Sequence, residues 1–374
     1  MRIIVVGAGV LGASVAFHLV QSGVDVIVIE PRLAGRATQA GAGIICPWLS
    51  ETGDAMFSSL YEGGARYYPE LIRFLGDADE VGYRRSGALY VSAVPGEIAD
   101  VERLLASRAK RTPEIGSVER LSPCRAQQLF PPLAPDLSAI HIGGAARVDG
   151  RKLAATLLAH ATRLGMKLVS GAATLAWRGR TVVGVHCNGE LLEADLVAAT
   201  NGAWGAEFLR PLGIALPIAP QRGQILHLEL PNHDTSGWPV VLPNGSHYLL
   251  AFEGGRIVAG ATRENGTGFD YRVTAAGQVE LLVEALRVAP GLRSATVVET
   301  RIGFRPAPPG LRPLLGHVRG IEGLVVGNGL GAGGLTMGPY VGKLLAEAIL
   351  GKPSFDLAPF DPLRPDFQTG PALR

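Results

Sequence analysis

The sequence predicts a two-domain α/β protein, in which a parallel sheet flanked by helices is joined to an antiparallel-sheet α+β domain. The 374-residue chain opens with a strand, a glycine-rich turn, a helix and a second strand. It closes with another strand, glycine-rich loop and helix. Between these units, residues 222–261 alternate as antiparallel strands do. A chain of this length also exceeds one ordinary core.

The opening unit is a Rossmann-like β-α-β motif. Residues 3–6 form a short β-branched run, typical of a parallel strand buried on both faces. Gly7, Gly9 and Gly12 then give the pattern G-x-G-x-x-G, which permits a tight turn and close approach to a pyrophosphate. The helix expected over 11–22 directs its first N–H groups at the phosphates.

An acid after the second strand completes a dinucleotide site. The strand expected over 26–29 ends at Glu30, 18 residues beyond Gly12. A carboxylate at this place accepts hydrogen bonds from both ribose hydroxyls and repels a 2′-phosphate, so NADP is disfavoured. The motif does not separate NAD from FAD, although its position at the start of the chain favours FAD.

Composition and charge exclude other classes of protein. The net charge is +2 and no basic stripe is interleaved with aromatic residues, so nucleic acid is not an expected partner. Cys46, Cys124 and Cys187 are too few and too widely spaced for a disulfide framework or a zinc site, and no histidine spacing indicates a metal. We therefore expect no metal and a cytoplasmic location.

Two apolar stretches could mislead a hydropathy scan. Residues 3–20 belong to the nucleotide-binding motif, which is also why no signal peptide is expected. Residues 324–342 carry no charge but contain seven glycines and a proline, a composition that suits a loop around a ligand better than a membrane helix. No membrane span is expected.

Helices and strands follow in both halves of the chain. Segment 31–48 is rich in Ala, Gly and Thr, so its backbone can lie against a flat ligand. We expect helices over 60–75, 99–110, 122–129, 150–164 and 274–288. Ser122 is the expected N-cap of the third of these helices. We expect strands over 87–93 and 196–199 and in TVVETRIGFRP, and a hairpin turn at Asn188-Gly189.

The closing unit decides between the two dinucleotides. It places a second glycine-rich loop and helix N-terminus about 320 residues after the first. An NAD site does not need a second loop of this kind. The pyrimidine edge of a flavin does, because it needs N–H donors, and a helix dipole there stabilises the anionic reduced flavin. FAD is the expected cofactor; the alternative is a glycine-rich packing turn. We predict a discontinuous FAD-binding domain (1–80, 140–218 and 305–374) and a substrate-binding domain (81–139 and 219–304).

Taken together, several motifs resemble the D-amino acid oxidase superfamily of FAD enzymes, in particular its glycine oxidase and D-amino acid dehydrogenase branch. They cover nearly the whole chain: VVGAGVLGASVAFHL, QAGAGIICPW, ARVDGRKL, LVAATNGAW, RGQILHL, YLLAFEGGRIVAGATRE, RIGFRPAPPGLRPLLG and GNGLGAGGLTMGPYVGKLLAEAI. The motifs are specific for the superfamily and not for a substrate.

The resemblance implies where FAD is held. The implied residues are Gly7, Ala8, Gly9, Val10 and Leu11 at the pyrophosphate, Glu30 at the ribose with Pro31 after it, Thr38 and Gln39 before the flavin segment, Gly43, Ile44 and Ile45 along the isoalloxazine, Thr174 at the adenine, and Leu330, Gly331, Ala332, Gly333, Gly334, Leu335 and Thr336 at the pyrimidine side. Cys46 lies in the flavin-adjacent segment, where it is either a small buried residue or a covalent attachment point.

The resemblance also implies a substrate site. Arg305, in GFRP, matches the arginine that binds the substrate carboxylate, and a bidentate pair would orient the α-carbon. Tyr248 matches a tyrosine at the entrance of the same pocket. From the residues alone, Arg305 could equally face solvent and Tyr248 could pack on its sheet. Glycine oxidases carry a further polar or basic residue in the last glycine loop, which here reads LGAGG, so a larger or N-substituted amino acid is as good a candidate as glycine.

The implied activity is FAD-dependent oxidative deamination of an amino acid or N-substituted glycine. A hydride passes from Cα to flavin N5, and the imine is hydrolysed to an oxo acid plus ammonia or an amine. The alternatives are a dehydrogenase that passes electrons to a quinone or another non-oxygen acceptor, and a non-catalytic FAD-binding subunit. The expected partners are the small-molecule substrate and oxygen or another electron acceptor. Whether the chain forms a homo-oligomer is left open.

Overall fold

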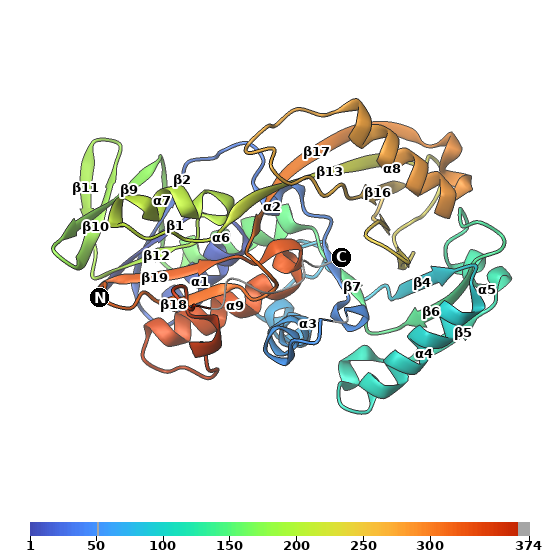
Figure 1. Ribbon diagram of the computed structural model, residues 1–374, viewed down its shortest axis with the longest axis horizontal. Helices are drawn as coiled ribbons and strands as arrows, with labels where there is room; N and C mark the ends of the chain where they lie inside the picture. Colours follow the sequence, from blue (N-terminus) through green and yellow to red (C-terminus); the bar gives the residue numbers. More distant parts are fainter. Residues whose placement is uncertain (51, 366–374) are drawn as a thin grey trace.

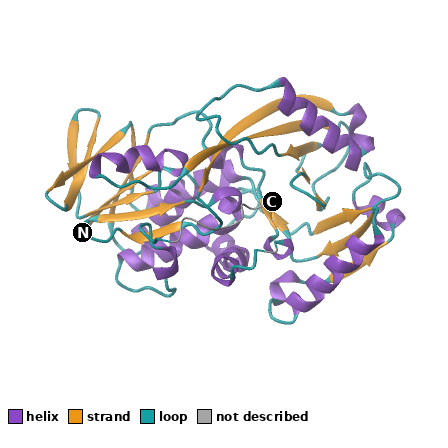
Figure 2. Ribbon diagram, in the orientation of Figure 1, coloured by secondary structure: helices purple, strands orange, loops and turns teal. Residues whose placement is uncertain are grey.

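The computed structural model describes residues 1–50 and 52–365, which form two lobes, each built on one large sheet (Figures 1 and 2). The first sheet has the strand order β18-β19-β12-β1-β2-β8. Its strands are β1 (Arg2–Val6), β2 (Asp25–Glu30), β8 (Lys167–Ser170), β12 (Leu196–Ala199), β18 (Leu314–His317) and β19 (Leu324–Asn328). All neighbours are parallel except β18 and β19, as the opening motif predicts.

Four helices pack together beside this sheet: α1 (Val10–Gln21), α3 (Ala55–Leu75), α6 (Gly150–Arg163) and α9 (Gly334–Ile349). Their apolar faces share one core with β1, β2 and β12. The predicted helix over 60–75 begins earlier, because the Asp54 carboxylate caps it by accepting from the N–H groups of Met56 and Phe57 at 3.0 and 3.1 Å. Ser122 caps its helix as predicted, accepting from the Arg125 N–H.

The second sheet is largely antiparallel and has the order β17-β13-β16-β15-β14-β4-β6-β5. Its strands are β4 (Ala88–Ser92), β5 (Val118–Leu121), β6 (Ser138–Ile142), β13 (Ala219–Glu229), β14 (Val240–Pro243), β15 (Tyr248–Ala251), β16 (Arg256–Gly260) and β17 (Thr296–Ala307). Only β14 and β4 pair in parallel. Helices α4 (Pro95–Ala109), α5 (Pro123–Leu129) and α8 (Ala275–Val288) belong to this lobe.

Two small sheets and two short helices complete the described fold. Strands β9 (Ala173–Arg178), β10 (Thr181–Cys187) and β11 (Glu190–Glu193) form an antiparallel meander, and β3 (Ile44–Ile45) pairs with β7 (Ala146–Arg147). The short helices are α2 (Ala37–Ala40) and α7 (Gly205–Leu209). Asn188 and Gly189 both have positive φ, 52° and 84°, which is the two-residue hairpin turn that the sequence predicts. Over the described residues, no helix has the length and apolar character that crossing a membrane requires.

The long strands β13 and β17 connect the lobes. They pair over almost their whole length, from Ala219 opposite Ala307 to Glu229 opposite Thr296. Figure 1 shows this ribbon running from the centre of the molecule into the antiparallel lobe. Its inner end lies beside the glycine loops of the parallel sheet, so it brings side chains of the second sheet to the carboxyl ends of β1 and β2, where open α/β sheets bind ligands.

Candidate active site

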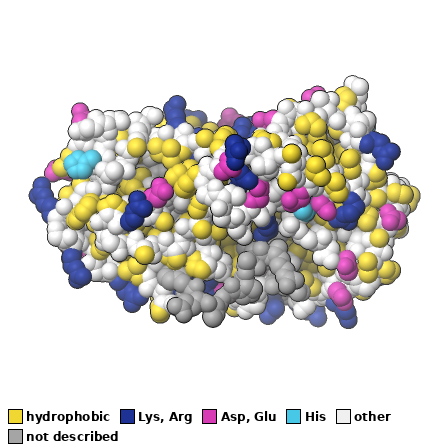
Figure 3. All heavy atoms as spheres, turned by 45° about the horizontal axis from the view of Figure 1, so that its top comes forward, with side chains coloured by type: hydrophobic (Ala, Val, Ile, Leu, Met, Phe, Trp, Pro, Cys, Tyr) yellow, Lys and Arg dark blue, Asp and Glu magenta, His cyan; other side chains and the backbone are white. Residues whose placement is uncertain are grey.

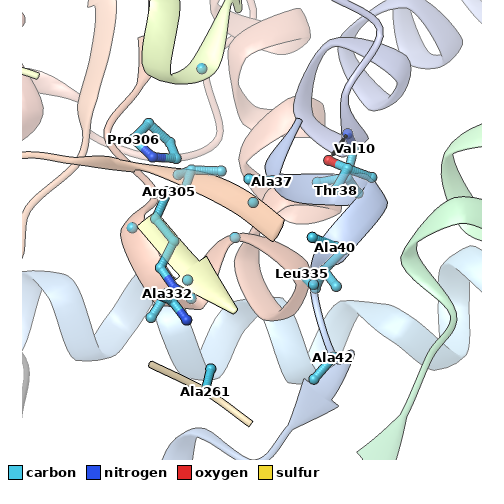
Figure 4. Close-up of a pocket in the computed structure, with 18 of the residues that line it drawn as sticks. Val10, Ala37, Thr38, Ala40, Ala42, Ala261, Arg305, Pro306, Ala332 and Leu335 are labelled. Atoms are coloured by element: carbon cyan, nitrogen blue, oxygen red, sulfur yellow. Dashed lines mark hydrogen bonds between the residues drawn. The ribbon is translucent and has the colours of Figure 1, made fainter. Parts of the chain in front are cut away.

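A cavity of about 490 Å³ lies between the two sheets. The parallel lobe contributes the loops after β1, β2, β12 and β19, and the antiparallel lobe contributes residues of β13, β15 and β17. Figure 4 shows Val10 and Thr38 at one part of the cavity and Arg305 pointing away from them, toward Ala261. The cavity is therefore long, and each lobe supplies a different part of its wall.

The first glycine loop is shaped for close contact with a ligand. A Cβ on Gly7 would lie 2.6 Å from the Thr200 carbonyl oxygen, and one on Gly12 would lie 1.9 Å from that of Gly7. Only glycine lets the strand, the loop and α1 approach this closely. The Val10 N–H at the start of α1 donates to Thr38 Oγ1 at 3.0 Å, which fixes the segment after β2 against the helix N-terminus.

Glu30 is buried at the end of β2 and is held in place by the loop it faces. Its carboxylate accepts from the Ala8 N–H at 2.7 Å and from the Arg32 N–H at 2.9 Å, and it pairs with Arg36 Nη1 at 3.3 Å. A carboxylate has about four acceptor positions, so capacity remains for a hydroxyl donor. The Glu30 side chain is thus held at the cavity wall with an acceptor position left over, as the predicted ribose contact requires.

The segment after α2 forms another part of the wall. Gly43 has φ of 96°, and a Cβ there would lie 1.7 Å from the Val148 carbonyl oxygen, so its backbone lies flat against β7 and its flank. Cys46 is buried and lines the cavity, and burial raises the pKa of its thiol to about 12. A neutral, buried thiol is the expected state of a small packing residue and not of a nucleophile.

The last glycine loop lies at the start of α9. Residues 329–335 line the cavity, with the short 3₁₀ turn Gly331–Gly333 directly before the helix. The N-terminal N–H groups and the positive dipole end of a 16-residue helix therefore face the ligand space. Thr336 fixes this turn by donating to the Ile44 carbonyl at 2.9 Å.

The Arg305 side chain extends from β17 into the cavity and lies over Gly223 of β13. Its Nη1 donates to the Thr262 carbonyl at 3.1 Å, and Gln221 Oε1 lies 3.5 Å away. A Cβ on Gly223 would lie 2.6 Å from both Nη1 and Nη2, so the guanidinium lies directly over that glycine. Arg305 is half-buried, and burial lowers its pKa.

Tyr248 lies over a second glycine. It stands opposite Gly260 in the β15–β16 pair, and a Cβ on Gly260 would lie 2.6 Å from the ring and the hydroxyl. Burial raises the pKa of the Tyr248 hydroxyl, and the nearby positive charge of Arg305 opposes that rise. The structure thus brings Arg305 and Tyr248 together in one part of the cavity.

Most of the residues predicted from the sequence line this cavity. They are Gly7, Gly9, Val10, Leu11, Glu30, Pro31, Thr38, Gly43, Ile44, Tyr248, Arg305, Leu330, Gly331, Ala332, Gly333, Gly334 and Leu335. Ala8, Gln39, Ile45 and Thr336 lie beside it and hold the wall: for example, the Gln39 carbonyl accepts from Arg151 and Ile45 pairs with Ala146.

Thr174 is not brought to the cavity. It lies on β9 opposite His186, in the small meander, and its side chain is exposed. The nearest link to the site is through Gly171, whose N–H donates to the Glu30 carbonyl oxygen. The implied adenine contact of Thr174 stays a prediction.

Sequence reasoning missed several lining residues. They are Tyr61, Tyr90, Asn201, Trp204 and Arg263. Asn201 follows the end of β12, and ligand-binding residues commonly follow the carboxyl ends of parallel strands. Its position in the sequence could therefore have predicted its place in the cavity. Its Oδ1 is buried with no hydrogen-bond partner among the described residues. Such an atom needs a donor, which a bound ligand supplies.

Comparison with known proteins identifies the family. The model of the DAO family, described as FAD dependent oxidoreductase, matches residues 2–348. The chain belongs to this family. FAD fits this cavity: the glycine loops before α1 and α9 allow close backbone approach, the Glu30 carboxylate is held in place, and the buried Asn201 oxygen lacks a donor.

Several members of this DAO family are similar over nearly their whole length. A crystal structure of iminodiacetate oxidase from Chelativorans sp. BNC1 has a TM-score of 0.94 and 48% identity, covering 96% of this chain and 99% of that one. The uncharacterized oxidoreductase YurR of Bacillus subtilis is also 48% identical, over 96% of this chain and 98% of its own. The glycine oxidase of Pseudomonas aeruginosa is 30% identical, with the same coverage of 96% and 98%.

Proposed function

We propose that this FAD-dependent oxidoreductase oxidises the C–N bond of an amino acid or an N-substituted glycine whose carboxylate is bound by Arg305. The observation that carries the proposal is the position of Arg305: it is half-buried, it lines the cavity, and no carboxylate of residues 1–50 or 52–365 pairs with it. A partly buried guanidinium without an anion is costly, so a carboxylate brought by the substrate completes the site.

The relatives support the same chemistry. Those of established activity include a glycine oxidase and an iminodiacetate oxidase, and both names describe oxidation of a CH–NH group next to a carboxylate. The last glycine loop, LGAGG, presents no polar side chain to the cavity. N-substituted glycines are therefore the favoured substrates.

FAD, when bound, supplies the two-electron acceptor. The chain itself orients the substrate: Arg305 fixes the carboxylate, and the Thr262 carbonyl, which accepts from Arg305 Nη1, holds the guanidinium in place beside Tyr248. Fixing two points of a small molecule converts binding energy into alignment of the carbon that is oxidised. Within the described part of the cavity wall, no carboxylate or neutral histidine touches Arg305, so no side chain is assigned as general base.

Anaerobic mixing of the purified holoenzyme with glycine, sarcosine, N-ethylglycine and D- and L-alanine tests this function. We expect at least one N-substituted glycine to remove the absorbance of the oxidised flavin. Arg305→Lys should lower the rate of flavin reduction by about 30-fold or more, because lysine cannot form the bidentate pair. A flavin that no amino acid or N-substituted glycine reduces would contradict the proposal. Admission of air then separates an oxidase from a dehydrogenase, since only an oxidase recovers its colour rapidly.

Two further predictions belong to this proposal. We assign the six-stranded sheet to the proposed FAD-binding domain and the eight-stranded sheet to the proposed substrate-binding domain. Two strands of the larger sheet cross the predicted divisions, β17 at residues 304–305 and β6 at residues 139–140. Cys46, Cys124 and Cys187 are free thiols, which supports a cytoplasmic location.

A further inference from the structure

A fully buried arginine, Arg147, lies at the junction of the two lobes. Its strand, β7, is the strand between them in Figure 1. On one side Arg147 stands opposite Ile44 of β3, and on the other side it exchanges two backbone hydrogen bonds of 2.9 Å with Arg84. Because Ile44 lines the cavity in the segment expected along the flavin, the backbone of Arg147 is joined directly to the cavity wall.

The side chain of Arg147 extends from β7 to the antiparallel lobe. Its Nη2 donates to the Glu253 carboxylate at 2.6 Å and to the Ser236 carbonyl at 3.1 Å. Its Nη1 donates to the Gly82 carbonyl at 3.3 Å, and its Cζ lies 4.5 Å from the ring centroid of Phe252. The guanidinium thus has hydrogen-bonded edges and a stacked face, so its direction and its plane are both fixed.

A second guanidinium connects the same ring to a helix of the parallel lobe. Arg256 Cζ lies 4.1 Å from the Phe252 ring centroid, and its Nη2 donates to Asp149 Oδ2 at 3.2 Å. Asp149 is the N-cap of α6 and accepts from the Arg151 N–H at 3.0 Å. Helix α6 packs on α1, which follows the first glycine loop. We call the group the interlobe clamp; it consists of Arg147, Asp149, Phe252, Glu253 and Arg256.

The interlobe clamp holds the turn of a hairpin whose other end lies at the cavity. Phe252 is in the turn between β15 and β16, and its N–H donates to the Arg256 carbonyl at 2.8 Å. The two strands stay paired as far as Tyr248, opposite Gly260. At about 3.3 Å per residue, Tyr248 is roughly 13 Å along the strand from Phe252. A displacement of the turn is therefore transmitted along two paired strands to the side chain beside Arg305.

The chemistry of the interlobe clamp suits the control of geometry better than the gain of stability. Burying a guanidinium costs about as much as its ion pair returns, and apolar side chains of the same volume often stabilise a fold as well or better. Arg147 Nε is in addition buried with no hydrogen-bond partner among the described residues, and the Glu253 side chain is exposed. An arginine supplies instead a planar fork that accepts one arrangement of acceptors.

We propose that Arg147 is a positioning residue for the oxidation step: it fixes the β15–β16 hairpin, and with it Tyr248, relative to the flavin segment on β3. In that step the substrate carbon loses a hydride to the cofactor and the amine loses a proton, which gives the imine. The inference rests on the proposed function, in which Arg305 binds the substrate carboxylate. Arg305 comes from β17, whereas the interlobe clamp acts on β15 and β16. Alignment of the substrate should therefore depend on Arg147 more than binding does.

Flavin reduction in the holoenzyme separates alignment from binding. The probe is sarcosine or N-ethylglycine, whichever reduces the wild-type flavin faster. Arg147→Met keeps a long side chain without charge or donors. We expect it to lower the reduction rate at saturation about tenfold or more and to raise the substrate Kd less than about threefold, because small misplacements slow the reaction more than they weaken binding. Arg287→Met, which breaks the 2.8 Å surface pair of Arg287 with Glu284 on α8, is the matched control and should change neither.

The FAD-loaded fraction of Arg147→Met decides the outcome, whatever its melting temperature. A reduction rate equal to that of the wild type would overturn the inference, and so would a rise in Kd as large as the fall in rate. Phe252→Leu removes the stacked ring and keeps an apolar side chain, and it should slow reduction about threefold or more. The double variant should be no slower than Arg147→Met alone, because both changes act through one contact. Losses that multiply in the double variant would contradict the proposal.

Hydrogen exchange in the apoprotein gives a readout that does not depend on turnover. The backbone amides of residues 248–260 should exchange about tenfold faster in Arg147→Met than in the wild type, whereas those of β1 should be unchanged. Equal exchange of this hairpin in both proteins would refute the role of Arg147. If the proposed function itself is wrong, no amino acid or N-substituted glycine reduces the wild-type flavin, and the difference in exchange remains.

Discussion

The position of the Arg305 guanidinium depends on the absence of a side chain at Gly223. A Cβ there would lie 2.6 Å from both terminal nitrogens. We expect Gly223→Ala to displace the guanidinium and to lower kcat/KM for a carboxylate substrate roughly a hundredfold, because a shift of about 1 Å at a reacting group has that effect. The unfolding temperature should change little, since the end of an arginine side chain can move aside.

Gly237→Ala is the matched control for this prediction, because a Cβ at Gly237 meets no atom within 4 Å. FAD content and kcat/KM of this control should equal those of the wild type. If Gly223→Ala keeps full kcat/KM, the guanidinium does not act from the position that the structure gives it.

Glu30 is the residue on which the ribose end of the cofactor site depends. It accepts from Ala8 and Arg32, so its removal frees the glycine loop as well as the ribose. We expect Glu30→Ala to weaken FAD binding by roughly 1.5–3 kcal/mol, which is about a ten- to hundredfold rise in Kd. Titration of the apoprotein with FAD measures this, with Asp25→Asn, an exposed acid of the same strand, as control. A Kd unchanged in Glu30→Ala would remove the ribose role.

At the scale of elements, the contact between α1 and α3 contains a histidine, His18, whose protonation lowers the free energy of unfolding. His18 Nδ1 donates to the Ser14 carbonyl at 2.7 Å, and Nε2 accepts from the Tyr67 hydroxyl at 2.7 Å, so the neutral ring satisfies both partners. Burial lowers the pKa of His18 from 6.5 to about 4. Protonation is therefore easier in the unfolded chain, and stability is lost as the pH falls through the window from 6.5 to 4.

From pH 7 to pH 5 this one group should cost about 2 kcal/mol of unfolding free energy. Urea titrations of the holoenzyme at the two pH values measure the change. His18→Gln should show a loss smaller by most of that amount, whereas His186→Gln, an exposed position of β10, should behave as the wild type does. Parallel curves for wild type and His18→Gln would contradict the assignment.

Elements with strong local signals could be predicted from the sequence. The strand–glycine–helix units at both ends, the Ser122 cap and the Asn188-Gly189 turn are all confirmed, because each depends on neighbouring residues. The orientation of Arg263 could not be predicted in this way. It depends on the pairing of Glu264 with Arg222, which lies 42 positions away in the sequence and in another strand. Pairing over such a distance leaves no periodic pattern around residue 263.

The same contrast applies to the cofactor site. Glycine spacing predicts Gly7 and Gly12, since close backbone approach excludes any side chain. It does not predict Trp204, which reaches the cavity by stacking on Phe269 of the other lobe, with ring centroids 4.8 Å apart. Contacts between lobes depend on how the two sheets are placed relative to each other, and neither sheet's sequence contains that information.

On the scale of the whole molecule, the cavity is formed by both lobes, and the Cys46 thiol that lines it is buried. The face of the molecule in Figure 3 mixes both signs of charge without a continuous basic region, in keeping with the net charge of +2. The Cys46 thiol beside the flavin segment is neutral because burial raises its pKa to about 12.

We therefore expect FAD to be held by non-covalent contacts alone. Acid precipitation of the purified protein should leave a colourless pellet and release all of the flavin as FAD, identified by chromatography. Flavin that stays with the denatured chain in the wild type and not in Cys46→Ser would show a covalent bond and contradict this prediction.

The extended segment at 261–264 has a consequence for how this enzyme can change over generations. Ala261 and Arg263 line the cavity, whereas Thr262 and Glu264 anchor the segment through hydrogen bonds. We therefore expect a mutation at 263 to change the cavity wall without loosening the scaffold, and a mutation at 262 or 264 to do the reverse. Such a separation lets single nucleotide changes explore new substrates while the protein remains folded. Directed evolution for other N-substituted glycines should begin by randomising positions 261 and 263 together.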